Sequence, residues 1–173
     1  RALRAEIEKM EAQYRKIFDS SGAGIFVLGS DGRLVNCNPT ALSIAGFEAV
    51  DVQRFKGLDL VQEAFAEPDA VRKMIAQAIH VRGTVAADLR LRTRDASQRW
   101  VHCLISAQSR SAVNGGSLPT SEHLIEGVIY DITERKRSES AVQHQAEHDP
   151  LTGLKNRQGT ETAVDRLLAD TLR

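Results

Sequence analysis

Apolar residues recur every three or four positions along the start of the chain, and charged residues fill the positions between them. This spacing predicts a helix over residues 1–20 whose apolar face has the heptad pattern of a coiled coil. An isolated helix of this length is marginally stable in water. We therefore expect the face to pack either on its own domain or on the same helix of a second copy. The apolar positions are Leu3, Ile7, Met10, Tyr14 and Ile17.

Strand patterns replace the helical pattern after Gly24. The apolar run 25–28 predicts one strand, and 34–37 predicts a second strand that returns beside it. Between them stands Asp31-Gly32, where glycine supplies at low cost the positive φ that a tight hairpin turn needs. The segment therefore predicts an antiparallel hairpin.

Helix signals fill the middle of the chain. Asn38-Pro39 predicts a short helix that stops at Gly46, because Asn accepts hydrogen bonds from free N–H groups and Pro fits the first helical turn. Residues 47–66 predict short helical pieces and turns. A longer amphipathic helix is expected over 69–80, opened by Pro68.

Three further strands are predicted over 89–94, 100–107 and 124–132, with a polar loop over 109–122. Strands joined by a turn or a short loop are antiparallel neighbours, and the helices between the two groups of strands must cross one face of the sheet. The expected fold class is α+β: a five-stranded antiparallel sheet with helices on one face, flanked by N-terminal and C-terminal helices.

Composition limits the possible partners. The 173 residues carry a formal net charge of zero, with 42% apolar and 27% charged residues. Without a net charge to attract a polyanion we expect no nucleic-acid partner. No apolar run reaches the roughly 18 residues that span a bilayer, so we expect no membrane contact by these residues and a cytoplasmic location. A parent protein with a membrane anchor upstream is compatible with this expectation.

Two phrases resemble the PAS sensor domain. GIFVLGSDGRLVNCNPTALSIAGF, residues 24–47, is similar to the opening hairpin and Asn-capped helix of PAS domains. LIEGVIYDITERKRSE, residues 124–139, is similar to their closing strand, which ends in Asp131-Ile132-Thr133 and passes into a charged helix. The resemblance implies a PAS-like sheet that binds a small ligand or a partner and passes a signal onward through Asp131, Ile132 and Thr133.

A third phrase, HDPLTGLKNR over residues 148–157, resembles the entry to the GGDEF family of diguanylate cyclases. We expect Gly153 to allow a tight turn, and Asp149 and Arg157 to form an ion pair or cap the next helix. Where family members often have a second Arg, this chain has Gln158. The matching residues are Asp149, Leu151, Thr152, Gly153, Leu154, Asn156 and Arg157, of which both leucines would hold the linker to the following domain.

These resemblances imply four segments: a helix over 1–20, a PAS domain over 21–133, a linker helix over 134–148 and the start of a GGDEF domain over 149–173. The family's catalytic loop, metal ligands and guanine pocket are not among these residues, so we expect no catalytic residue, no metal site and no enzyme activity in this chain. We expect a homodimer. In the parent protein, the resemblance implies that two cyclase domains, each with GTP and magnesium, meet and form cyclic di-GMP.

Candidate cofactors follow from the same resemblance. A pocket between helices and sheet would be lined by Ile44, Phe47, Phe55, Leu58, Phe65, Met74 and Ile75. Haem would need a ligand such as His80, and flavin could stack on Trp100. The Asn36-Cys37-Asn38 context lacks the helix setting of a photoreactive LOV cysteine, so Cys37 and Cys103 are expected to be buried thiols. The alternatives are a haem or flavin redox or gas sensor, and a ligand-free dimerisation module of a GGDEF or phosphodiesterase regulator.

Overall fold

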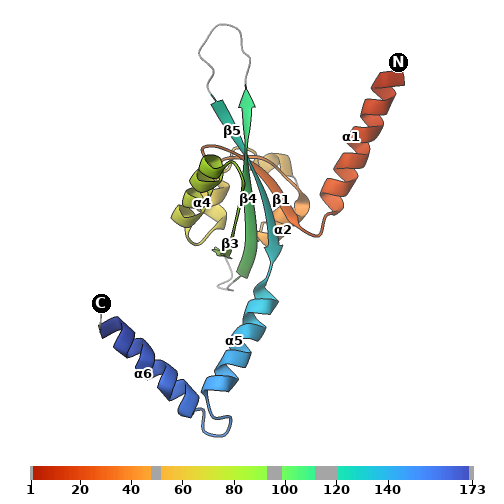
Figure 1. The fold of residues 1–173 in the computed structure, drawn as a ribbon. Coiled ribbons are helices and arrows are strands. Elements are labelled where there is room, and N and C mark those ends of the chain that lie inside the picture. The colour runs from red at the N-terminus through yellow and green to blue at the C-terminus, as the bar shows by residue number, and fades with distance from the viewer. Residues whose placement is uncertain (1, 48–51, 93–98, 112–120, 172–173) are drawn as a thin grey trace. The chain divides into compact units, whose positions relative to one another are not determined.

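The computed structural model describes residues 2–47, 52–92, 99–111 and 121–171. The chain forms two compact units, Arg1–Ile132 and Thr133–Arg173. The first unit contains a sheet with its helices, and the second contains two helices joined by a turn (Figure 1). In chain order the elements of the first unit are α1 (Ala2–Ser20), β1 (Gly24–Gly29), β2 (Leu34–Cys37), α2 (Pro39–Ile44), the 3-10 helix η1 (Val52–Phe55), α3 (Leu60–Ala64), α4 (Pro68–Val81), β3 (Thr84–Leu91), β4 (Arg99–Ser111) and β5 (Ser121–Asp131).

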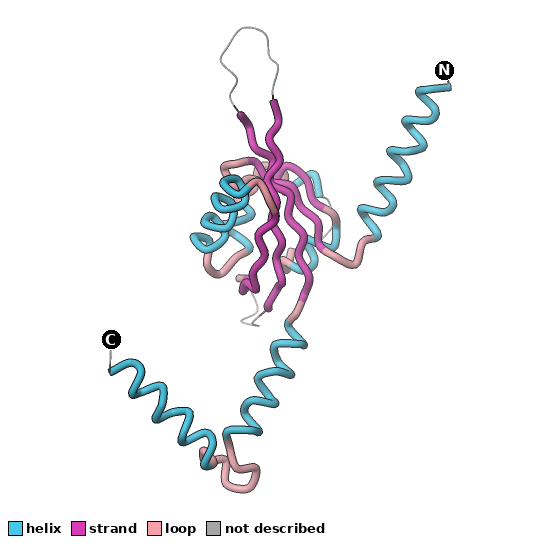
Figure 2. Tube along the Cα trace, viewed as in Figure 1, coloured by secondary structure: helices cyan, strands magenta, loops and turns pink. Residues whose placement is uncertain are grey.

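The five strands form one antiparallel sheet in the order β2-β1-β5-β4-β3 (Figure 2). The first hairpin therefore pairs with the last strand, and β5 lies at the centre with β1 beside it. Side chains alternate along β1, where Phe26 and Leu28 are buried and Ile25 and Val27 are half-buried. The predicted α+β fold, with a five-stranded antiparallel sheet and helices on one face, is confirmed.

The core lies between this sheet and the helices α2, α3 and α4. Val101, Cys103 and Ile105 of β4 are completely buried, and they belong to one apolar cluster with Ala78 and Val71 of α4. Burial of this apolar surface is the main force that closes the helices over the sheet. The core contains mostly aliphatic side chains, as the scarcity of aromatic residues in the sequence requires.

A glycine in β5 leaves space for the ring of Phe26, a buried aromatic residue of the core. Gly127 lies opposite Phe26 on β1, and a Cβ atom at this position would collide with the Phe26 ring. The apolar run that predicts β5 is interrupted by Gly127 for this reason. A side chain here would force the ring out of a close-packed interior, which is destabilising.

Three strands differ in their bounds from the predictions. β3 begins at Thr84 and ends at Leu91, whereas the predicted strand spans 89–94, of which residues 93 and 94 lie outside the described residues. Its first half contains Ala86 and Ala87, which carry little of the apolar alternation that reveals a strand. β4 extends to Ser111 and β5 begins at Ser121, and residues 112–120 of the predicted loop lie outside the described residues. These polar ends pair with each other beyond the helices, where no apolar face is needed (Figure 1). Because they lack an alternating apolar face, their sequence predicts a loop.

The second unit is a helix–turn–helix. α5 (Thr133–Glu147) and α6 (Arg157–Thr171) are joined by nine residues that include the His148–Lys155 bridge. Gly159 lies in the first turn of α6, where a Cβ atom would collide with the carbonyl oxygen of Glu147. The two helices therefore approach each other closely at the turn because residue 159 has no side chain.

Candidate ligand and signalling sites

The space between the sheet and its helices is almost filled. A cavity of about 10 Å³ lies between them. This volume is at the lower limit for one water molecule, whereas pockets for drug-sized ligands measure roughly 300–1,000 Å³. The residues that line the cavity are Phe26, Cys37, Ala41, Leu42, Ala45, Leu60, Ala64, Phe65, Leu91 and Ile129.

The seven predicted pocket residues lie in or beside the same core. Ile44, Phe65, Met74 and Ile75 are buried, and of the seven only Phe65 lines the cavity. The other three are partly buried against the core: Phe47, Phe55 and Leu58. The Phe47 and Phe55 rings lie 5.2 Å apart, a normal distance for an aromatic pair. In this structure the seven side chains pack the interior.

The described residues do not fit haem or flavin. His80 lies in the last turn of α4 with an exposed side chain, and so it does not point into the core. The half-buried Trp100 stands on β4 with the Arg90 guanidinium 5.8 Å from its ring centre. His102 forms a 2.8 Å hydrogen bond with Asp88 on the neighbouring strand, so its ring already has a partner within the sheet. A tetrapyrrole or isoalloxazine ring would also need far more volume than the cavity offers.

Both cysteines are buried thiols, as predicted. Burial raises the pKa of Cys37 to about 11 and that of Cys103 to about 12. Because the thiolate is the reactive form, neither group is prepared for nucleophilic or redox chemistry at neutral pH. Among the described residues there is also no group of three potential metal ligands.

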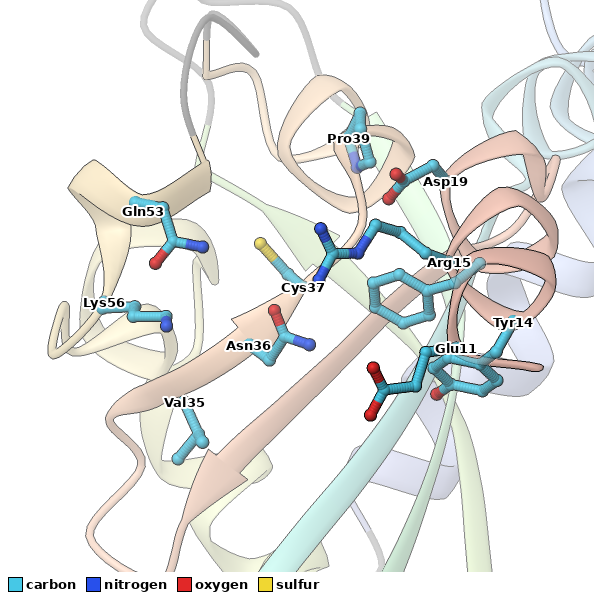
Figure 3. A pocket seen from close by; sticks show the side chains of 11 residues that line it. Glu11, Tyr14, Arg15, Asp19, Val35, Asn36, Cys37, Pro39, Gln53 and Lys56 are labelled. Atoms are coloured by element: carbon cyan, nitrogen blue, oxygen red, sulfur yellow. The ribbon is translucent and has the colours of Figure 1, made fainter. Parts of the chain in front are cut away.

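A larger groove of about 690 Å³ lies outside the core, between α1, β2 and η1. Figure 3 shows the α1 side chains Glu11, Arg15 and Asp19 on one side, with Asn36 and Lys56 on the other. Two acidic and two basic side chains line it, so their charges cancel. No local sequence pattern predicts this groove, because its walls come from segments that are distant along the chain. The arrangement favours no particular ligand charge.

Asn38 connects α1, β1 and α2. Its side chain is completely buried, and its Oδ1 accepts hydrogen bonds from the backbone N–H groups of Ile25 and Ala41. Its Nδ2 donates to the backbone oxygens of Phe18 (3.0 Å) and Ala23 (2.9 Å). All four hydrogen-bonding positions of the amide are therefore used. The helix cap at Ala41 was predicted, and the other three bonds were not.

The sheet leads almost directly into the second unit along the chain. β5 ends at Asp131 and α5 begins at Thr133, so Ile132 alone separates them. The Ile132 N–H donates to the Trp100 carbonyl at 2.9 Å, which continues the pairing of β5 with β4 by one residue. Thr133 is a buried polar residue. The predicted transmission residues 131–133 thus lie where the strand becomes a helix.

The turn between α5 and α6 is stabilised by its own polar groups. Asp149 Oδ1 accepts hydrogen bonds from the N–H groups of Leu151 and Thr152 and from the Thr152 hydroxyl. These bonds, those to Thr152 first, lower the pKa of Asp149. Gly153 adopts a positive φ of 68°, as a tight turn requires. The leucines at 151 and 154 are 94% and 70% exposed.

Asn156 closes this turn. Its Oδ1 accepts a hydrogen bond from the Gly159 N–H and caps α6, while its Nδ2 donates to the Ala146 carbonyl of α5 at 2.7 Å. The expectation that Asp149 and Arg157 form an ion pair or cap α6 is wrong for the described residues. Arg157 lies inside α6 and pairs with Glu161, one turn further along, at 3.1 Å.

Comparison with solved structures finds the same fold. The PAS domain of an HTR-like protein from Haloarcula marismortui superposes with a TM-score of 0.59 and 17% identity over 76% of this chain and 100% of that chain. A PAS domain from Colwellia psychrerythraea gives a TM-score of 0.55 and 16% identity over 73% and 99%. A sensory box histidine kinase/response regulator from Burkholderia thailandensis gives 0.51 and 23% over 76% and 92%. Identities this low establish the fold alone.

Among curated proteins, an uncharacterized protein of Sinorhizobium fredii, y4lL, is 29% identical over 168 residues. The match covers 93% of this chain and 19% of that protein, so the chain spans about a fifth of its length. No helix within the described ranges is both long and apolar enough to cross a membrane. The model of the PAS fold matches residues 12–109, more than half of the 173 residues. The chain therefore belongs to the PAS family, and its sheet with the covering helices is a PAS sensory domain.

Proposed function

We propose that this PAS domain regulates a diguanylate cyclase domain that follows it in a longer parent protein. The observation that carries the proposal is the turn over residues 149–157. Asp149, Gly153 and Asn156, which match the entry motif of GGDEF domains, are the residues whose hydrogen bonds and backbone geometry form this turn. A motif that is both present in sequence and used in the fold is stronger support than the letters alone.

The longer relative supports the same proposal. The matched region covers 93% of the chain, whereas the first unit ends at residue 132 of 173, so the match must extend into the second unit. At least the greater part of the second unit is therefore similar in sequence to a region of a protein about five times as long. This is the arrangement expected of a sensory domain whose linker leads to further domains.

We infer that the signal passes from β5 into α5 and through the 149–157 turn. The seam of α5 is weak, because Arg135 and Glu139 occupy the positions that precede Val142 and Ala146. A weak seam can change register at low cost, and a ligand or partner that prefers one register would shift the population. In a dimeric parent, the register would set the distance between two cyclase domains, each with bound GTP and magnesium.

Of the alternatives, the ligand-free module is favoured over the haem or flavin sensor. The core cavity of about 10 Å³ and the exposed His80 support this choice. The PAS domain would then respond through its partner contacts. The absorption spectrum of the purified protein tests this directly: we expect no band above 300 nm, and a Soret or flavin band would contradict the inference.

The decisive experiment uses the full-length parent protein. We expect it to convert GTP, with Mg²⁺ as cofactor, into cyclic di-GMP, detected by mass spectrometry. Asn156→Ala should weaken the turn and reduce the response of the rate to the PAS domain, whereas Lys155→Ala, at an exposed neighbouring position, serves as the matched control. A parent with no GGDEF domain after the turn, or with no product despite an intact catalytic loop, would overturn the proposal.

A further inference from the structure

Two histidines stand one helical turn apart at the end of α5. His144 lies in the last turn of the helix, and His148 is the first residue after it. Their rings stack with centres 4.1 Å apart and planes inclined by 23°. Side chains four positions apart lie on the same face of a helix. The spacing therefore places two imidazole groups side by side at the entry to the 149–157 turn.

The His148 ring is held in one tautomer. Its Nδ1 lies 3.1 Å from the carbonyl oxygen of His144, and the same oxygen accepts the His148 backbone N–H at 3.0 Å. Because a carbonyl oxygen can only accept, Nδ1 carries the proton, and Nε2 of the neutral ring keeps a free lone pair. A hydrogen bond from the other ring nitrogen to a backbone carbonyl is the usual arrangement of a histidine that binds a metal.

The His144 ring can supply a second nitrogen. It is exposed, and within the described part of the chain it stacks on His148 and has no hydrogen-bonding partner of its own. Two nitrogens bound to one tetrahedral Zn²⁺ at about 2.0–2.1 Å lie roughly 3.3 Å apart. This span is close to the separation of the ring centres, and rotation of the exposed His144 side chain can adjust it without moving the helix.

The carboxylates nearest to the pair already have partners. Glu147 Oε1 accepts a hydrogen bond from Gln143 at 2.9 Å, and Asp149 Oδ1 accepts the bonds that form the turn. The free ligands are therefore nitrogen atoms. Mg²⁺ and Ca²⁺ prefer oxygen ligands, whereas imidazole suits Zn²⁺, Cu²⁺ and Ni²⁺. This donor set selects a transition-metal cation.

We propose that His144 and His148 form a binding site for a divalent transition-metal ion, and that Zn²⁺ fits the separation of the rings. Nε2 of His148 and one ring nitrogen of His144 are the protein ligands, and water completes the coordination. The bound ion fastens the last turn of α5 to the residue at which the turn begins. This inference differs from the expectation of no metal site, and it does not depend on a following cyclase domain.

A Zn²⁺ titration of the untagged, metal-free chain tests the site by calorimetry. We expect one ion per chain. His144→Ala and His148→Ala should each weaken binding by about 100-fold, because the second nitrogen no longer binds within the same molecule. The matched control is His80→Ala, which removes an exposed histidine from α4 and should leave the dissociation constant unchanged. Circular dichroism checks that each variant is folded.

NMR gives a second test that identifies the ligand atoms. Zn²⁺ should shift the Nε2 signal of His148 while its Nδ1 keeps the proton. It should also slow exchange of the His148 backbone amide, whose hydrogen bond to the His144 carbonyl spans the same two residues as the ion. Mg²⁺ should do neither. Equal affinity of His144→Ala and the unchanged chain, equal shifts of all five histidines, or no saturation at millimolar Zn²⁺ would each overturn the proposal.

Discussion

Two asparagines make the same type of connection in different surroundings. Asn38 caps α2 with its Oδ1 and donates to the carbonyl of Phe18 in α1. Asn156 caps α6 with its Oδ1 and donates to the carbonyl of Ala146 in α5. Asn38 is 0% exposed and has two further bonds, whereas Asn156 is partly exposed in a turn of polar residues. The comparison shows that burial determines how much the hydrogen bonds of such an asparagine contribute to stability.

The physical reason lies in the alternative available to each group. When a bond to Asn156 is lost, water can replace it at little cost. When a bond to Asn38 is lost, buried backbone groups remain without a partner, which costs about 1–3 kcal/mol each. The stability of the first unit therefore depends strongly on the Asn38 side chain, whereas the stability of the second unit depends weakly on several side chains.

Asn38→Ala should have the largest effect. It leaves the N–H of Ile25 and the carbonyl of Ala23 without their side-chain partner and removes the cap of α2. We expect the free energy of unfolding to fall by about 3–5 kcal/mol, measured by urea denaturation. Asn36→Ala, an exposed change on the adjacent strand, should cost less than about 0.5 kcal/mol. Equal losses of unfolding free energy in the two variants would contradict the inference that burial makes the bonds of Asn38 important.

Gly24→Ala tests how tightly the Asn38 junction is packed. A Cβ atom at Gly24 would lie 2.8 Å from the Ala41 Cα and 2.6 Å from an Ile129 side-chain carbon. Because Ala41 contributes backbone, which cannot move aside, we expect a loss of about 1–3 kcal/mol in unfolding free energy. Gly22→Ala is the matched control, since nothing lies within 4 Å of its Cβ position. Thermal unfolding of the three proteins gives the ranking.

Asn156→Ala should cost about 1 kcal/mol, the usual value of a helix cap, and the loss should stay local. Amide hydrogen exchange should accelerate in the first turn of α6 and remain unchanged in β1 and β5. A fifteen-residue helix such as α6 is marginal without support, so the change should be visible. Faster exchange throughout the sheet would show that the two units unfold together, contrary to the comparison.

The smallest effect is a pH dependence of the turn. The folded turn lowers the pKa of Asp149, chiefly through its bonds from Thr152, so folding favours the charged carboxylate. Its contribution is therefore complete above the ordinary value of 3.8 and is lost as the pH falls through the lower folded value. The amide signals of residues 151 and 152 should report this loss in an NMR titration. Asp149→Asn should show no such transition, and an identical titration of the two proteins would contradict the assignment.

The sequence predicted the parts of these junctions that are local. The cap of α2 joins Asn38 to Ala41, three residues away, and a cap leaves a recognisable pattern of residue types. The bonds of Asn38 to Ile25, Ala23 and Phe18 span 13, 15 and 20 residues, and no local pattern encodes them. The expected Asp149–Arg157 contact was wrong because Asn156 caps α6 and Arg157 has a nearer partner in Glu161.

The residue types of the core could be predicted from the sequence, but the volume of its cavity could not. Apolar residues such as Phe65 and Met74 are needed for a core whether or not it holds a ligand. A cavity depends on the fit of many side chains, such as that of Phe26 over Gly127, and one misplaced methyl group changes its size. The paired ends of β4 and β5 were not predicted, because polar strands that lie in water lack an alternating apolar face.

The single residue between β5 and α5 has a consequence for anyone who joins this domain to a different output. Ile132 is still hydrogen-bonded to the sheet, and residue 133 already begins the helix. The connection therefore contains no loop that could accommodate an inserted residue. Each residue added or removed within α5 rotates everything downstream by about 100° around the helix axis and moves it by about 1.5 Å. Functional chimaeras should therefore recur with insertions of seven residues, which restore the original angular phase within about 20°.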